Sequence, residues 1–111
     1  MNGLWIKLGY NNVYFSNARS MARFGLLLLA KGKWNGTSIL ADTNYLSAQI
    51  NSSQTINPSY GYLTWLNGKT SYMVPTVQLS LNGKLVPNAP ADLYAALGKD
   101  DQKIYVVPSQ G

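Results

Sequence analysis

The chain has 111 residues, enough for one domain with a modest core and too few for two, and 46% of them are apolar, as in an ordinary folded protein. It contains no cysteine and no histidine, which excludes a disulfide framework, a thiol nucleophile, an imidazole base and the usual zinc sites. We expect no metal and no cofactor, and any hydrolytic chemistry must use another base.

The basic residues outnumber the acidic ones by nine to four, which gives a net charge of +5. Such a charge can favour nucleic acid, but the basic residues are scattered and form no run typical of a binding tail. We therefore expect no nucleic-acid partner, with a basic nucleic-acid binder as the weaker alternative. No stretch reaches the roughly 18 apolar residues of a membrane span, so no transmembrane segment is expected.

The N-terminal third predicts one strongly apolar helix. Residues 2–15 are rich in glycine, asparagine and aromatic residues and predict loop or short extended pieces. Ser16 is a suitable N-cap for the helix that follows, and Gly32 is a suitable C′ residue. Apolar side chains surround most of this helix, including those of Leu26 to Leu29, which predicts a helix buried on most sides.

A turn and a second helix are expected next. Asn35 and Gly36 form a typical turn pair, and Ile39–Leu40 reads as a short buried segment. Asp42 is a suitable N-cap for a helix over residues 43–50.

The second half of the sequence predicts strands. We expect one strand over Tyr60–Leu66, followed at Asn67-Gly68 by a hairpin or an excursion. Residues 91–98 fit a helix or a strand by propensity alone, and "QKIYVVP" predicts a strand stopped by Pro108. This last strand and the apolar helix both need partners that the sequence does not supply.

Three segments together resemble a known family. They are "SNARSMARFG" with "KGKWNG", then "SYGYLTWLNG", then "LYAALGKDDQKIYVVPS". In this order they resemble the serine β-lactamase and penicillin-binding-protein-like hydrolases, especially the class C-like esterase and amide-hydrolase branch. The resemblance covers nearly the whole chain. It implies an α+β, partial β-lactamase/transpeptidase-like fold with helices packed on an antiparallel sheet, truncated at both ends, in which residues 1–111 form a single partial domain.

The catalytic motif of that family is missing from this sequence. Such enzymes acylate the serine of a Ser-x-x-Lys motif, with the lysine and a tyrosine moving protons. The nearest stretch here is Ser20-Met21-Ala22-Arg23, which ends in an arginine that stays protonated and cannot act as a base. In the family the nucleophile lies well before this helix, in sequence that would precede Met1. We therefore expect no catalytic residue in this chain.

Two further stretches imitate family motifs. Tyr10-Asn11-Asn12 spells Tyr-x-Asn, but it lies immediately before the helix and favours a turn. Lys69-Thr70-Ser71 nearly spells Lys-Thr-Gly, but it follows Asn67-Gly68 and favours the outgoing arm of a hairpin. We assign neither to a site.

The resemblance places the family's Lys/His-x-Gly motif at Ala96-Leu97-Gly98, counted back from Pro108. The backbone N–H of Lys99 would then be the second oxyanion-hole donor. Ala96 departs from the family's lysine or histidine, which puts β-lactam carboxylate recognition in doubt and favours the esterase or amidase branch. An alternative for Gly98 is a turn that needs positive φ.

Three further side chains are candidates for the rim of a cleft: Gln102, Tyr94 and Trp65. Aromatic residues in strands more often belong to the core. Both interpretations stay open at this point.

The resemblance implies a parent enzyme that hydrolyses a small-molecule ester or amide through an acyl-serine intermediate. This chain alone is expected to be inactive, with a missing N-terminal half as its partner. Family members are often exported, which suggests a periplasmic or extracellular parent, although the compartment of this chain stays unknown. The alternative is a non-catalytic module that binds a peptide, a glycan or a partner chain through Trp5, Trp34, Trp65 and the tyrosines. A fragment should leave apolar patches on Leu26–Leu29 and the final strand, whereas a module should cover them.

Overall fold

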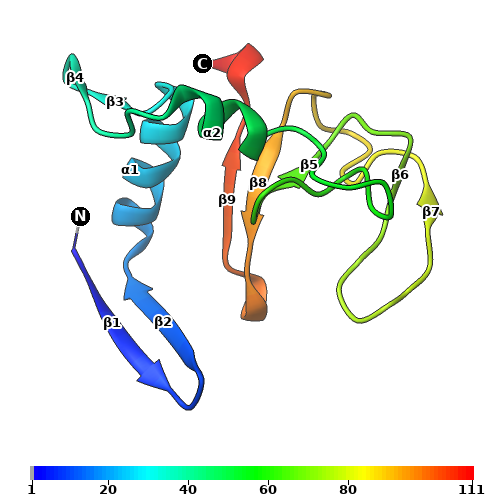
Figure 1. The fold of residues 1–111 in the computed structure, drawn as a ribbon, viewed down its shortest axis with the longest axis horizontal. Coiled ribbons are helices and arrows are strands. Elements are labelled where there is room, and N and C mark those ends of the chain that lie inside the picture. The colour runs from blue at the N-terminus through cyan, green and yellow to red at the C-terminus, as the bar shows by residue number, and fades with distance from the viewer. Residues whose placement is uncertain (1) are drawn as a thin grey trace.

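The computed structural model describes residues 2–111, which form an α+β domain of two α-helices and small antiparallel sheets (Figure 1). The helices are α1 (Ala18–Leu29) and α2 (Thr43–Gln49). The strands are β1 (Gly3–Leu8), β2 (Asn11–Ser16), β3 (Lys33–Trp34), β4 (Thr37–Ser38), β5 (Trp65–Leu66), β6 (Ser71–Tyr72), β7 (Leu81–Asn82), β8 (Tyr94–Leu97) and β9 (Lys103–Val106). Short 3-10 turns at Lys99–Asp101 and Pro108–Gln110 follow the last two strands.

The main sheet has the strand order β5-β8-β9 and is antiparallel throughout. Its register aligns Leu66 with Tyr94 and Tyr94 with Val106, so these three side chains form one row on one face. All three are buried, and Leu28 and Leu29 of α1 pack against them. This row is the apolar core of the described residues.

Helix α1 begins and ends one residue away from the predicted caps. Asn17, not Ser16, is the N-cap, because its side chain accepts from the Ser20 N–H at 2.9 Å. The Ser16 hydroxyl instead donates to the Asn2 carbonyl at 2.7 Å. At the other end the Gly32 N–H donates to Leu27 and the Lys31 N–H to Leu28, the two bonds of a Schellman motif. Lys31 is therefore the C′ residue, with φ 52°, and the assignment of Gly32 to that position is wrong.

The prediction that α1 is buried on most sides is also wrong. Its contacts are mainly with β9, where Gly25 lets the helix approach closely, since an added Cβ would lie 3.0 Å from Ile104. Leu26, which borders the hollow between α1 and β9, is 53% exposed. The helix has an apolar surface that the described residues cover only in part.

Residues 3–16 form a long hairpin, so the extended alternative is confirmed, although its two strands are longer than the short pieces predicted and loop is confined to the turn. Strands β1 and β2 pair over six residues each, joined by a turn at Gly9 and Tyr10. Figure 1 shows this hairpin extending away from the main sheet. Its attachment to α1 is polar, since the Asn2 N–H donates to the Ser20 hydroxyl at 3.0 Å.

The region between the two helices agrees more closely with what the sequence predicts. Asn35 and Gly36 both have positive φ in the tight turn between β3 and β4, as predicted. Asp42 caps α2 by accepting from the Tyr45 N–H at 2.9 Å. Ile39, however, is 55% exposed, so the predicted buried segment is not formed there.

The strand predicted over Tyr60–Leu66 is mostly wrong, because only Trp65 and Leu66 pair with β8. The chain then leaves the sheet until residue 93, and buried Asn67 anchors both ends of this excursion. Its side-chain amide donates to the carbonyls of Val86 and Pro90 at 3.1 and 2.9 Å, and its oxygen accepts from the Val86 N–H at 3.0 Å. Its backbone N–H donates to Leu93, which begins the return to the sheet.

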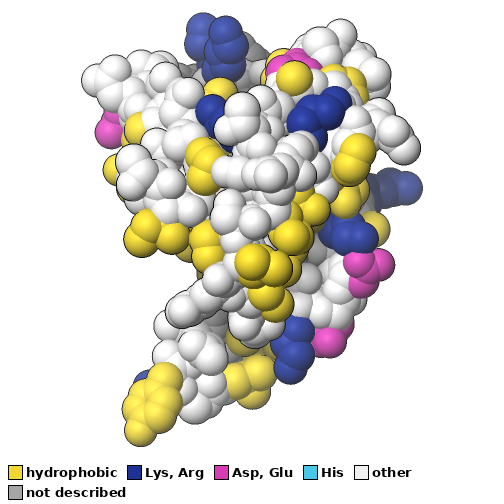
Figure 2. Space-filling view, turned by 90° about the vertical axis from the view of Figure 1, so that its right-hand side faces the viewer, with side chains coloured by type: hydrophobic (Ala, Val, Ile, Leu, Met, Phe, Trp, Pro, Cys, Tyr) yellow, Lys and Arg dark blue, Asp and Glu magenta, His cyan; other side chains and the backbone are white. Residues whose placement is uncertain are grey.

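The molecule has a large surface for its mass. Its accessible area is 8059 Å², whereas about 6,100 Å² is expected for a folded monomer of 12.2 kDa. Its radius of gyration of 14.8 Å also exceeds the roughly 13 Å expected for this length. Figure 2 shows apolar side chains spread over one face and over the narrow arm at the bottom.

We expect Asn67→Ala to lower the free energy of unfolding by about 2–4 kcal/mol, because it leaves the Val86 N–H and two carbonyls without their buried partner. Asn82→Ala is the matched control, since Asn82 is exposed on β7. Urea unfolding followed by circular dichroism measures both. Equal stability of the two variants would contradict the anchoring role of Asn67.

Candidate functional site

The candidate oxyanion-hole segment lies where β8 turns into β9. Ala96 and Leu97 end β8, and the Gly98 N–H donates to the Gln102 carbonyl at 2.8 Å across the turn. Gly98 has φ −109°, an extended conformation, so the alternative that it needs positive φ is wrong. Positive φ occurs instead at Asp100 and Asp101. An added Cβ on Gly98 would make an ordinary contact with Gln102 at 3.6 Å, so local geometry does not require glycine there.

Lys99 is exposed and follows Gly98 at the start of this turn. The segment 96–99 is therefore continuous with the main sheet and sits at one end of it. As a backbone donor, Lys99 needs no particular side chain. A backbone N–H at this position can donate one hydrogen bond to a bound group.

The Ser-x-x-Arg stretch belongs to the scaffold. Ser20 is 2% exposed, and its hydroxyl accepts from the Asn2 N–H while its own N–H bonds to the N-cap Asn17. Arg23 lies three residues further along α1 and is exposed. The hydroxyl therefore joins the first hairpin to the helix.

The two imitations of family motifs lie outside the turn that follows β8. Tyr10 is fully exposed in the β1–β2 turn, as predicted, whereas Asn11 and Asn12 belong to β2. Ser71 lies in β6 and pairs with Asn82 of β7. The hairpin arm predicted for residues 69–71 thus has a different partner, because the excursion from Asn67 separates β5 from β6.

The structure does not bring the three candidate rim residues together. Tyr94 is 7% exposed in the core row. Trp65 pairs with Ala95, which places its side chain on the opposite face, where its ring meets that of Tyr60 edge-to-face at 4.8 Å. Gln102 is exposed next to β9. The core interpretation therefore holds for Tyr94, and the three side chains do not share one cleft.

The charged groups beside the turn form one ion pair, between Lys103 and Asp101. The hydrogen bond and the charge of Asp101 raise the pKa of Lys103 above its usual value. Within residues 2–111, no three acidic, histidine or cysteine side chains are grouped in a way that could hold a metal ion. In the same described range, no helix has the length and apolarity to cross a membrane.

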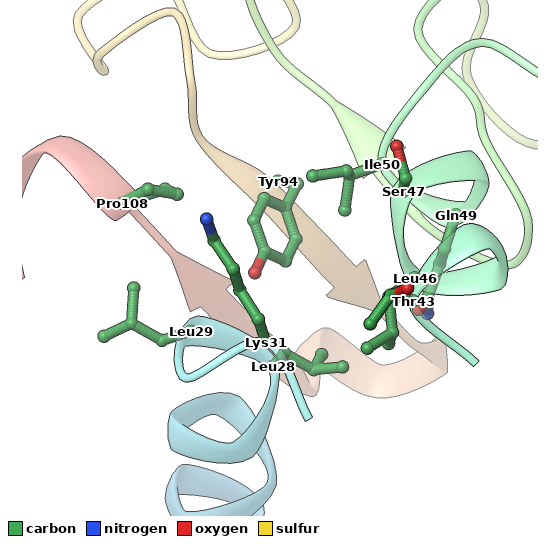
Figure 3. A pocket seen from close by; sticks show the side chains of 10 residues that line it. All are labelled: Leu28, Leu29, Lys31, Thr43, Leu46, Ser47, Gln49, Ile50, Tyr94 and Pro108. Carbon is green, nitrogen blue, oxygen red and sulfur yellow. The ribbon is translucent and has the colours of Figure 1, made fainter. Parts of the chain in front are cut away.

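Sequence reasoning missed a cavity of about 300 Å³ between the end of α1, helix α2 and β8 (Figure 3). Its walls are mainly apolar, and Lys31 and Tyr94 contribute the polar groups that Figure 3 shows at its centre. This volume is at the lower end for ligand pockets and suits an apolar group. No local motif could reveal it, because three distant segments meet there.

No family model, curated protein or solved structure matches this chain.

Burial raises the pKa of the Tyr94 phenol above its ordinary value of 10. The stabilisation linked to this shift is complete below the ordinary pKa and is lost as the pH rises through the higher folded-state value. We expect an alkaline absorbance titration of the native chain to contain a late phenol step that Tyr94→Phe and urea each abolish. A late step that persists in Tyr94→Phe would contradict this assignment.

Proposed function

We propose that this chain is a partial domain of a β-lactamase-related serine hydrolase. The parent hydrolyses a small-molecule ester or amide through an acyl-serine, and further polypeptide supplies the Ser-x-x-Lys nucleophile. Alone, the chain has no hydrolase activity. The motif order supports the family, and the sequence itself contains no Ser-x-x-Lys.

The observation that carries this proposal is the uncovered surface. The accessible area exceeds the expected area by about 2,000 Å², and a stable protein interface typically takes about 800 Å² from each partner. The described residues thus expose enough surface for an extensive contact with further polypeptide.

The position of this surface supports a partial domain over a self-contained module. Leu26 on α1 is 53% exposed, and Tyr105 on β9 is 49% exposed. The two interpretations differ in whether α1 and β9 are covered. In a self-contained module these elements should be covered. The absence of a basic side chain at Ala96 supports an ester or amide substrate over a β-lactam, with the Lys99 N–H as one oxyanion donor.

The second candidate is a non-catalytic binding module, and the first hairpin favours it. Trp5 and Phe15 are 68% and 52% exposed there. Trp34 is also exposed, whereas Trp65 is half-buried against Tyr60 and is less accessible. Exposed aromatic side chains are common anchors for partners.

The purified chain should form no phosphonyl adduct with a fluorophosphonate probe and show no burst with p-nitrophenyl acetate, because the sequence holds no Ser-x-x-Lys. Intact-mass spectrometry and absorbance measure the two effects. An adduct of one probe per chain that Ser20→Ala abolishes would contradict the proposal.

A further inference from the structure

The cavity between the end of α1, helix α2 and β8 has mainly apolar walls. Leu28 and Leu29 contribute from α1, and Leu46 and Ile50 contribute from α2 and its C-cap. Its volume of about 300 Å³ is the space of about ten groups of the size of a water molecule, at about 30 Å³ each. An aliphatic chain of about eight carbons with a small polar head group fills such a space.

The Tyr94 hydroxyl lies in this cavity without a hydrogen bond. The side chain is only 7% exposed, yet within residues 2–111 none of the side-chain hydrogen bonds involves its hydroxyl. No fully enclosed polar side-chain atom of the described residues lacks a partner, so this hydroxyl is in contact with the open space of the cavity. Figure 3 shows it among the side chains that line the cavity. A ligand oxygen beside it would satisfy a buried donor.

Lys31 determines the charge that the cavity prefers. It is the one charged residue among the described residues that line the cavity. The ion pair of residues 2–111 joins Lys103 to Asp101, so the Lys31 ammonium has no acidic partner there. Figure 3 shows the Lys31 side chain extending next to Tyr94. A carboxylate between these two groups can accept from the ammonium and from the phenol at once.

We propose that this cavity binds a medium-chain aliphatic carboxylate. Its chain lies between Leu28, Leu46 and Ile50, and its carboxylate lies beside Lys31 and Tyr94. The small volume favours an aliphatic chain over a peptide, since each backbone N–H and C=O of a peptide needs a hydrogen-bond partner. The inference goes beyond the proposed function, because it needs no nucleophile and concerns a site that this chain forms alone.

The test titrates the purified chain with sodium octanoate and, as an uncharged ligand of equal chain length, with 1-octanol. We expect saturable shifts in the methyl NMR signals of Leu28, Leu46 and Ile50, and about tenfold weaker binding of 1-octanol. From butanoate to octanoate the affinity should rise by about fourfold per methylene. Longer chains should gain little more, because the cavity is then full.

Two variants test the head-group contacts. Lys31→Met keeps the length of the side chain and removes its charge, so it should weaken octanoate binding by about tenfold and leave 1-octanol binding unchanged. Lys33→Met is the matched control, because Lys33 is exposed on β3 and does not line the cavity. Tyr94→Phe removes the hydroxyl and should also weaken octanoate binding by about tenfold. Circular dichroism checks that all three variants keep their fold.

Three results would overturn the proposal: no saturable binding, 1-octanol binding as tightly as octanoate, or equal losses in Lys31→Met and Lys33→Met. Shifts at Leu63 and Leu79, which are 81% and 57% exposed, without shifts at the cavity methyls would show adsorption to the surface and would also contradict it. Tighter binding of N-acetyl-leucyl-leucine than of octanoate would assign the cavity to the C-terminus of a peptide instead.

Discussion

One row of apolar side chains across the main sheet holds this fold together. Leu66, Tyr94 and Val106 come from three strands, and α1 covers them with Leu28 and Leu29. Burial of apolar side chains is the main force in folding, and here it is concentrated in a single small cluster. Leu28, Leu29 and Tyr94 also line the cavity next to α2, so the same contacts that form the core form one wall of the cavity.

Hydrogen bonds of buried polar side chains fix the segments that do not contact the apolar core. Asn67 ties the long excursion to β5 through buried hydrogen bonds, and the Ser59 hydroxyl donates to the Ser71 carbonyl at 2.7 Å to fix β6. Ser20 joins the first hairpin to α1. Such bonds specify geometry, but they bury little apolar surface. Hydrogen bonds therefore hold the segments together, while much of the apolar surface of the molecule is exposed.

The sequence was informative where structure is local. The helix capped by Asp42, the Asn35-Gly36 turn and the strand stopped by Pro108 are confirmed, because capping and turn chemistry act within a few residues. The predictions from the sequence failed where the structure depends on contacts between segments that are far apart in the chain. The shortening of the strand predicted over Tyr60–Leu66 to Trp65 and Leu66, and the exposure of Leu26 and Ile39, depend on which segments meet or fail to meet. For the same reason the cavity next to α2 could not be predicted. The positive φ that was one alternative for Gly98 occurs instead at Asp100 and Asp101 of the same turn.

We propose that the described residues form a domain whose exposed apolar surface is covered by further polypeptide. Sedimentation velocity over a range of concentrations, combined with near-ultraviolet circular dichroism, tests it most directly. Our account predicts concentration-dependent association or a weak aromatic signal, because α1 and β9 are only partly covered. A monodisperse monomer with a strong, fixed aromatic signal at every concentration would contradict it.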